Sequence, residues 1–301
     1  MDYKYYSSLD GVTLDLSNQS LVDLTTPPVN IGKNVYINPD GTHVFISSSK
    51  SANSTYNGDV FVYVYDSSAK TWSYQTSFYN LVHTASNLFQ SHEGNTGANP
   101  ANFGKIVITN DDATIAYIGI PGFRQSSLDC GAVAIVERTN TTWSFVDFII
   151  NRNSSGNAIQ ANQSFGSALA FGGSSLFVGT STNYSYSNAN VFLYSISGTT
   201  YTKDNAFDIK PDVSETTATA NFGTSLACSS DGLRLFVGSD YYAQHVDSTN
   251  YYTGDVHIFY YNSSTSSWVL IQSCYSVIKN SVPTAAVHNE SSIGKQISIN
   301  N

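Results

Sequence analysis

The chain has 301 residues, and 22 acidic side chains against 13 lysines and arginines give it a net charge of −9 at pH 7. No run of basic residues occurs, so we expect no nucleic-acid partner, because phosphate contacts require lysine and arginine. No stretch approaches the roughly 18 apolar residues of a membrane-spanning helix, so no membrane span is expected.

The remaining composition indicates where such a chain works. Charged residues make up only 12%, whereas 21 tyrosines accompany abundant serine, threonine and asparagine, which is typical of exposed β proteins outside the cytoplasm or in large assemblies. Residues 1–8 lack the apolar core of a signal peptide. Either a leader has been replaced by a new start, or the chain needs none, as a virion component would. We expect an extracellular or virion surface and a place in a larger assembly.

Residues 1–31 show no full repeat. Residues 11–16 and 20–24 alternate apolar and polar side chains on either side of a turn at 17–19, and are predicted to be two strands. Two interpretations stay open. These strands are the outer pair of a sheet completed by the C-terminus, which would hide open sheet edges, or they are an extension along the surface.

From residue 32 onward one pattern recurs, and each copy predicts a four-stranded antiparallel unit. The copies start at a glycine that follows phenylalanine or isoleucine: Gly32, Gly104, Gly166, Gly223 and Gly294. A tight turn then separates the first two strands, at 39–41, 110–112, 172–173 and 230–232. Asp, Asn and Gly at these turns tolerate the positive φ that a hairpin needs.

The second half of each copy is as regular. Third strands are predicted to begin with the tripeptides at 58–60, 131–133, 189–191 and 254–256, each of which ends in valine. An aromatic residue opens each fourth strand: Trp72, Trp143, Tyr201 and Trp268. All three tryptophans of the chain occupy this one position. We expect these rings to pack blade against blade, with stacking of sugars as the alternative.

Four-stranded units of about 60 residues predict an all-β fold, a β-propeller of four complete blades plus partial closing strands. The blades are expected at 32–80, 104–150, 166–207 and 223–274. A further copy begins at 292–301, which either completes a five-bladed ring with residues 11–24 or indicates a longer protein; we favour the longer protein.

The motif Phe-Gly, Asp-Gly, Leu-Phe-Val-Gly, Gly-x-Val-x-Ile-Phe and then Trp resembles FG-GAP repeats, the blades of integrin-α-like propellers. Gly119-Ile-Pro-Gly122 is the nearest copy of the Gly-Ala-Pro part. Many FG-GAP blades carry a calcium loop between their first two strands, but here that connection is too short to supply six to eight oxygen ligands. Asp40, Asp111 and Asp231 are therefore predicted to be turn formers, and no metal site or cofactor is expected.

The connections between strands are predicted to be unequal. Turns between strands one and two, and three and four, are short. Loops between strands two and three, and links between blades, are long, and in a meander both emerge at one end. Binding residues usually lie on such loops. The candidates are Tyr241, Tyr242, His245, Tyr251 and Tyr252 in loop 239–253, and Arg124 in loop 120–130, with packing of these loops as the plainer alternative.

No catalytic residue is selected by the sequence, because the six histidines show no metal pattern and no nucleophile elbow occurs. Cys130, Cys228 and Cys274 have no metal spacing; buried free thiols are expected, with a Cys228–Cys274 bridge as the alternative. The predicted function is therefore a non-catalytic module that binds other proteins or surface glycans, for adhesion or as a minor structural protein. The alternative is a carbohydrate-active enzyme, a glycosidase or lyase, using the central mouth.

Overall fold

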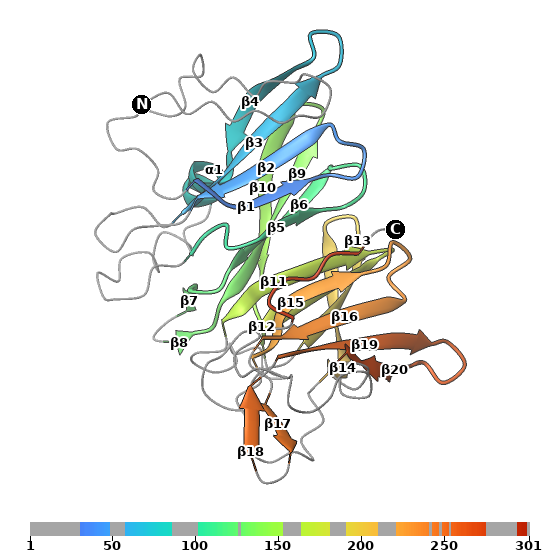
Figure 1. The fold of residues 1–301 in the computed structure, drawn as a ribbon. Coiled ribbons are helices and arrows are strands. Elements are labelled where there is room, and N and C mark those ends of the chain that lie inside the picture. The colour runs from blue at the N-terminus through green and yellow to red at the C-terminus, as the bar shows by residue number, and fades with distance from the viewer. Residues whose placement is uncertain are drawn as a thin grey trace. The chain divides into compact units, whose positions relative to one another are not determined.

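Four antiparallel sheets of four strands each carry the fold in the computed structural model (Figure 1). The structure describes residues 31–48, 58–85, 102–125, 128–152, 164–180, 191–209, 221–240, 243–246, 249–252, 254–274 and 294–299. The chain divides into two compact units. Unit 1 comprises Met1–Ile118 and Ala134–Asp147, and unit 2 comprises Gly119–Val133 and Phe148–Asn301.

Each sheet is a meander of neighbouring strands. Sheet 1 contains β1 (Ile31–Ile37), β2 (His43–Ser48), β3 (Asp59–Asp66) and β4 (Thr71–Ser77), in that order. Sheet 2 contains β5 (Val107–Thr109), β6 (Ile115–Ile120), β9 (Ala132–Thr139) and β10 (Thr142–Ile149). Sheet 3 contains β11 (Phe165–Gly172), β12 (Ser175–Thr180), β13 (Val191–Ser197) and β14 (Thr200–Ile209). Sheet 4 contains β15 (Phe222–Cys228), β16 (Arg234–Ser239), β19 (Asp255–Asn262) and β20 (Ser267–Ser273).

The predicted fold class is confirmed: the described residues are almost entirely β and form four β-propeller blades. One helix, α1 (Phe78–Ala85), was not expected, because residues 78–80 were assigned to the end of the first blade and 81 onward to a loop. The helix follows β4 directly and packs beside β3 (Figure 1). It buries Phe78 and Val82, which lie on one face because they are four residues apart. No helix of the described ranges is long and apolar enough to span a bilayer.

The turn between the first and second strands is built in the same way in sheets 1, 2 and 4. In sheet 1 the side-chain oxygen of Asn38 accepts the amide hydrogen of His43 at 2.7 Å, and Asp40 accepts that of Thr42 at 2.9 Å. Asp231 accepts the amide of Leu233 in sheet 4. Asp40 and Asp231 are therefore turn formers, as predicted.

Sheet 2 requires one correction at this turn. The carboxylate that accepts the turn amide is Asp112, bonded to the nitrogen of Thr114 at 3.2 Å, and not Asp111. The sequence comparison was one residue out of register because two aspartates are adjacent here. Ala113 consequently occupies the place of Gly41 and Gly232, and it adopts a φ of 51°.

A turn around the repeat glycine explains the Phe-Gly motif. The amide of Lys105 donates to the carbonyl of Asn102 at 3.1 Å, and Ser167 and Thr224 make the equivalent bond to Ser164 and Asn221. Glycine therefore sits third in a four-residue turn with φ near 77–90°, a conformation that favours glycine. The same turn lies against the preceding blade, because a Cβ at Gly104 would be 2.9 Å from the carbonyl oxygen of Asp59.

Three of the four aromatic residues at the start of the fourth strands pack between blades, as predicted. Within unit 1, Trp143 is buried against Phe45 and Phe78, with ring centroids 6.0 and 5.0 Å away. Within unit 2, Trp268 meets Phe177 edge-on at 5.4 Å, and the Tyr201 hydroxyl donates to the carbonyl of Phe148. Trp72 instead contacts Tyr65 of its own sheet.

The C-terminal segment begins like another copy of the repeat. A Cβ at Gly294 would lie 2.1 Å from the carbonyl oxygen of Asp255, and Gly294 has a φ of 84°. This glycine therefore takes the same place against sheet 4 that Gly104 takes against sheet 1. Residues 294–299 are not in a strand. The predicted strands at 11–16 and 20–24 lie outside the described residues.

Candidate functional site

Each of the four sheets carries its long connections at one of its two ends. In each sheet the short turns join the first strand to the second and the third to the fourth, whereas residues 49–58, 121–131, 181–190 and 240–254 join the second to the third. The links between sheets, 78–106, 150–164 and 210–221, leave and enter at that same end because the sheets are meanders. We call it the long-link end. It was predicted to be the binding end.

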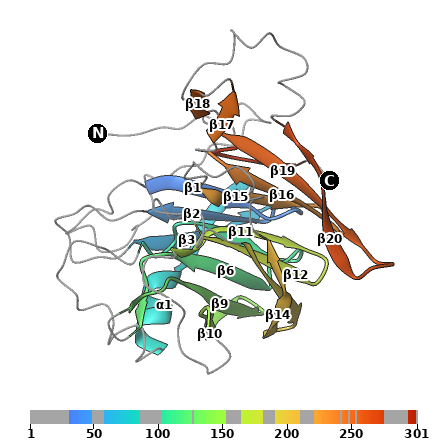
Figure 2. The same ribbon diagram turned by 90° about the horizontal axis from the view of Figure 1, so that it is seen from below.

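Among the described parts of these connections, two small hairpins are formed, both in unit 2. Strands β7 (Arg124–Gln125) and β8 (Leu128–Asp129) pair within the 121–131 connection. Strands β17 (Ala243–Val246) and β18 (Thr249–Tyr252) pair within the 240–254 connection and make a ribbon separate from the strands of sheet 4 (Figure 2).

The predicted binding residues divide between these hairpins. His245 lies on β17, and Tyr251 and Tyr252 lie on β18, where Tyr251 pairs with Gln244 and Tyr252 with Ala243. The hairpin therefore brings these three residues onto one ribbon. Arg124 lies on the other hairpin, opposite Asp129. Tyr241 and Tyr242 lie outside the described residues.

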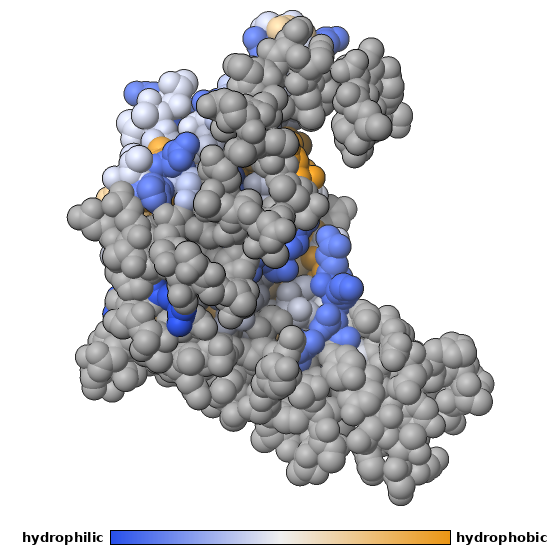
Figure 3. Space-filling model, turned by 90° about the vertical axis from the view of Figure 1, so that its left-hand side faces the viewer, coloured by the Kyte–Doolittle hydropathy of each residue, from blue (hydrophilic) through white to orange (hydrophobic). Residues whose placement is uncertain are grey.

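A small surface hollow, with room for about one water molecule, lies at the long-link end of unit 1. Its lining is Lys33, Ser48, Asn102, Phe103, Gly104 and Lys105. The fold brings these residues together because Lys33 follows the repeat glycine of sheet 1, Ser48 ends β2, and residues 102–105 form the Phe-Gly turn of sheet 2. On the face drawn in Figure 3, the described residues that reach the surface are mainly hydrophilic.

One lysine of this hollow, Lys105, has a shifted pKa. The pKa of Lys105 is lowered from its ordinary value, first by desolvation at the wall of the hollow and second by repulsion from the Lys33 ammonium. Among the described residues neither ammonium group forms an ion pair. The sequence reasoning missed both lysines. A signal was present, because lysine follows the repeat glycine at three of five copies: Lys33, Lys105 and Lys295.

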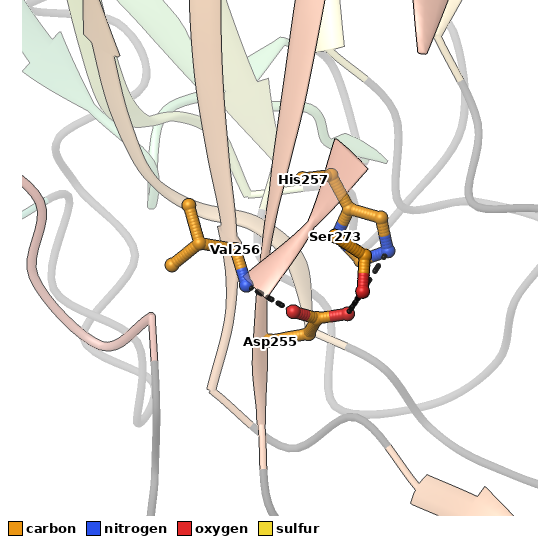
Figure 4. A network of polar contacts seen from close by, with 4 residues as sticks. All are labelled: Asp255, Val256, His257 and Ser273. Carbon is orange, nitrogen blue, oxygen red and sulfur yellow. Dashed lines mark hydrogen bonds and ion pairs between the residues drawn. The ribbon is translucent and has the colours of Figure 1, made fainter. Parts of the chain in front are cut away.

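A buried polar network in sheet 4 contains an aspartate, a histidine and a serine (Figure 4). Asp255 opens β19 and accepts the Ser273 hydroxyl at 2.5 Å and the amide of Val256 at 2.7 Å. The Nε2 atom of His257 lies 3.7 Å from the Asp255 carboxylate. Desolvation lowers the pKa of His257, with Asp255 and the backbone of Val237 acting in the opposite direction.

These three groups do not have the arrangement of a hydrolase triad, in which histidine stands between serine and carboxylate. Here the serine donates directly to the aspartate. Asp255 and His257 are also only 1% and 6% exposed, so a substrate would not reach them. The network supports packing at the start of β19.

Sheet 1 has an aspartate at the same position, with different surroundings. Asp59 opens β3 and accepts the amides of Val60 at 2.7 Å and Tyr79 at 2.8 Å, so that it caps the start of α1. Burial raises the pKa of Asp59 to about 7, although the amide of Val60, the hydroxyl of Ser77 and the amide of Phe78 oppose the shift. Asp59 is therefore partly protonated near neutral pH.

The described part of the chain contains no group of three or more His, Cys, Asp or Glu side chains that could hold a metal ion. Cys130, Cys228 and Cys274 are free thiols, and the first two are buried. The predicted alternative of a Cys228–Cys274 bridge is therefore wrong. Cys228 belongs to the core of unit 2, where it packs with Phe177, Phe222 and Leu235.

Comparison with known proteins adds little to this description. No family model matches the sequence, and no curated protein matches it. Among solved structures, a "putative 6-phosphogluconolactonase" from Bacteroides fragilis matches with 14% identity and a TM-score of 0.40, over 79% of this chain and 53% of that chain.

Two further structures match at a similar level. A protein from Lactobacillus plantarum has 10% identity and a TM-score of 0.38, over 79% of this chain and 69% of that one. The Dos1 propeller has 12% identity and a TM-score of 0.40, over 82% and 60%. This chain thus spans between about half and two thirds of their lengths. The blades are assigned from the strand pairing alone. These structural similarities give no information about activity.

Proposed function

We propose that the chain is a non-catalytic module that binds other proteins or surface glycans through the long-link end of its blades. Its setting would be an extracellular surface or a virion, in which it serves adhesion or acts as a minor structural protein. The observation that carries the proposal is the asymmetry within each sheet, which has its short turns at one end and its long connections at the other. A rigid scaffold that presents irregular chain at one end is a common design for binding.

Two other features support the proposal. The repeat resembles FG-GAP blades, and integrin-α-like propellers are a precedent for such modules. The His and Asp side chains that come together in sheet 4 are buried and are bonded as a packing network, which does not favour the alternative of a glycosidase or lyase. Tyrosines in the 240–254 connection offer large amphipathic contact area at low entropic cost.

Shortening one long connection tests this proposal. Ser239 and Asp255 are register partners on β16 and β19, so a tight Asn-Gly turn can replace residues 240–254 without separating the two strands. The control variant exchanges the short turn at 263–266 of the same sheet for Asn-Gly. We expect the first variant to lose most of its association with purified native surfaces or particles, and the control to keep it.

The measurement is the fraction of protein that co-sediments with those surfaces, with folding checked by circular dichroism. Equal retention of both variants would contradict the proposal. Turnover of a polysaccharide by the wild-type chain would contradict its non-catalytic part.

A further inference from the structure

The first strand of sheet 1 exposes apolar side chains at positions where the other first strands bury them. On β1, Val35 is 60% exposed and Ile37 is 53% exposed. On the first strands of sheets 2, 3 and 4, the side chains of Val107, Leu169 and Leu226 are 0%, 2% and 8% exposed. Strand β1 is also an edge strand of its sheet. Exposed apolar side chains on an edge strand favour packing against another segment of chain.

The two exposed side chains of β1 lie on the face of sheet 1 that points away from sheet 2. Tyr36, which lies between Val35 and Ile37, pairs with Phe45 on β2. Phe45 in turn packs against Trp143 of sheet 2. Successive side chains of a strand point to opposite faces, so Val35 and Ile37 lie on the opposite side of the sheet. We call this side the outer face of sheet 1.

Trp72 lies on this outer face as well. Val44 pairs with Ile37 on β1 and with Tyr63 on β3, and Tyr65, two residues further along, pairs with Trp72. Cross-strand partners share one face of a sheet. In sheets 2 and 4 the tryptophan at this position packs on the sheet that precedes it in the chain, whereas Trp72 contacts Tyr65 of its own sheet. The missing neighbour of the outer face would therefore come from the chain before residue 31.

We propose that residues 11–24, which lie outside the described residues, cover the outer face of sheet 1 as a pair of antiparallel strands. They occupy the place in the chain that the third and fourth strands of a copy occupy before the next copy begins. Their first strand has Val12, Leu14 and Leu16 on one side. That apolar side would pack on the exposed side chains of β1, in the way that one blade packs on the next. This inference is independent of the proposed binding function.

The covalent connection favours this segment over any separate molecule. From residue 24 to residue 31 the extended chain reaches roughly 23 Å. The path from a fourth strand to the first strand of the next sheet crosses three strand spacings of about 4.8 Å and one sheet spacing of about 10 Å, which is roughly 18 Å in a straight line. The connection is therefore long enough. A segment held by so short a linker has an effective concentration on the order of millimolar, which a second copy or another protein does not reach in dilute solution.

The test is an NMR experiment on the full chain, deuterated except at the methyl groups of isoleucine, leucine and valine and at the tryptophan rings. Nuclear Overhauser effects (NOEs) report protons that lie close together in space. We expect NOEs that join the methyl groups of Val35 and Ile37, and the ring of Trp72, to methyl groups of residues 11–24. These signals should be present in dilute solution without any added partner, because the covering segment belongs to the same chain.

Two variants of the full chain sharpen the test. In L14S/L16S the apolar side of the first covering strand becomes polar, so we expect the NOEs to the outer face to be lost. The control T13S/D15N changes the opposite side of the same strand and should keep them. The NOEs of the wild type decide the question by themselves if L14S/L16S does not fold.

Three results would overturn the proposal. The first is the absence of NOEs between the outer face and residues 11–24 in the wild type. The second is NOEs between differently labelled copies in a mixed sample, which would make a second copy the occupant. The third is an outer face whose methyl signals change only when native surfaces or particles are added, which would make another molecule the occupant. None of these results bears on the replacement of residues 240–254, which tests the long-link end of unit 2.

Discussion

Sheets 1 and 4 place an aspartate at the same point of the same motif and use it differently. Asp59 and Asp255 each open a third strand, and each accepts the amide of the following valine at 2.7 Å. In both sheets, the residue two positions after the aspartate pairs with a serine on the neighbouring fourth strand. That residue is Phe61 in sheet 1 and His257 in sheet 4. Asp59 therefore shares its strand with a phenylalanine and caps a helix, whereas Asp255 has a histidine beside it.

This difference predicts opposite pH responses from equivalent positions. Asp59 has a pKa raised in the folded state, so the folded chain holds a proton that the unfolded chain has released between about pH 4 and 7. Its contribution to the free energy of unfolding falls as pH rises through that window. His257 has a lowered pKa, so its contribution is lost as pH falls below about 6.5.

The largest expected effect on stability concerns the glycine that packs against the backbone of each aspartate. In G104A the new Cβ meets Val60 and the carbonyl of Asp59 and must adopt a φ of 77°, so we expect unit 1 to lose about 3 kcal/mol of unfolding free energy. Urea unfolding, followed by the fluorescence of Trp143 in a W72F/W268F background, measures the loss.

The matched control for that change is G32A. Gly32 has a similar φ of 86°, but a Cβ there would have no neighbour within 4 Å. We expect a loss of about 1 kcal/mol, from backbone strain alone. Equal losses of unfolding free energy in G104A and G32A would show that the Phe-Gly turn does not pack tightly against β3, which begins at Asp59.

The second effect is a gain of stability in D59N. Asparagine keeps an oxygen for the amides of Val60 and Tyr79 but has no proton to lose, so we expect unit 1 to gain about 2 kcal/mol at pH 8 and almost nothing at pH 4. Urea unfolding at a series of pH values checks this. A gain that does not depend on pH would show that Asp59 does not titrate in this range.

The third effect concerns acid sensitivity in sheet 4. In H257F a phenylalanine takes the place that Phe61 has in sheet 1, against the ring of Phe222, which lies 5.4 Å from His257. Between pH 7 and 5 the wild type should lose about 1 kcal/mol more than the variant does. Thermal unfolding monitored at Trp268 measures how the stability of each protein changes with pH. Equal changes in the wild type and the variant would show that His257 does not cause the acid sensitivity.

The smallest effect extends the comparison to the turns. Sheets 1 and 4 have Gly41 and Gly232 where sheet 2 has Ala113, and all three adopt positive φ. A113G should therefore raise the unfolding free energy of unit 1 by about 0.5 kcal/mol, because relief of left-handed strain exceeds the entropy that glycine adds to the unfolded chain. A midpoint in urea that falls would contradict this interpretation.

The sequence was sufficient to predict the structural features that all copies of the repeat share. It was not sufficient to predict the features that occur in one copy only. Recurring residues predict the four sheets, their short turns and the packing of Trp143 and Trp268, because the same residue types at the same repeat positions make the same contacts. Helix α1 could not be predicted in this way. It occurs in one link only, and its first turn is capped by Asp59, which lies about twenty residues earlier in the chain.

The candidate site shows the same limit. Long connections could be identified by counting residues, and His245, Tyr251 and Tyr252 were found to share a hairpin. Lys33 and Lys105 were missed because they are far apart in the chain and become neighbours only when the Phe-Gly turn of sheet 2 lies beside sheet 1. Repeated Gly-Lys pairs were visible, but nothing in the sequence alone says which lysines line the same hollow.

The central claim is that the long-link end is the working end of the blades. The most direct measurement is photo-cross-linking of the chain in its native setting, with benzoylphenylalanine placed at Arg124 or His245 on the hairpins, or at Gly198 or Ser264 on short turns of the same unit. The account predicts cross-links to other molecules from positions 124 and 245 and few from 198 and 264. Equal yields at both ends, or cross-links from the short turns alone, would contradict it.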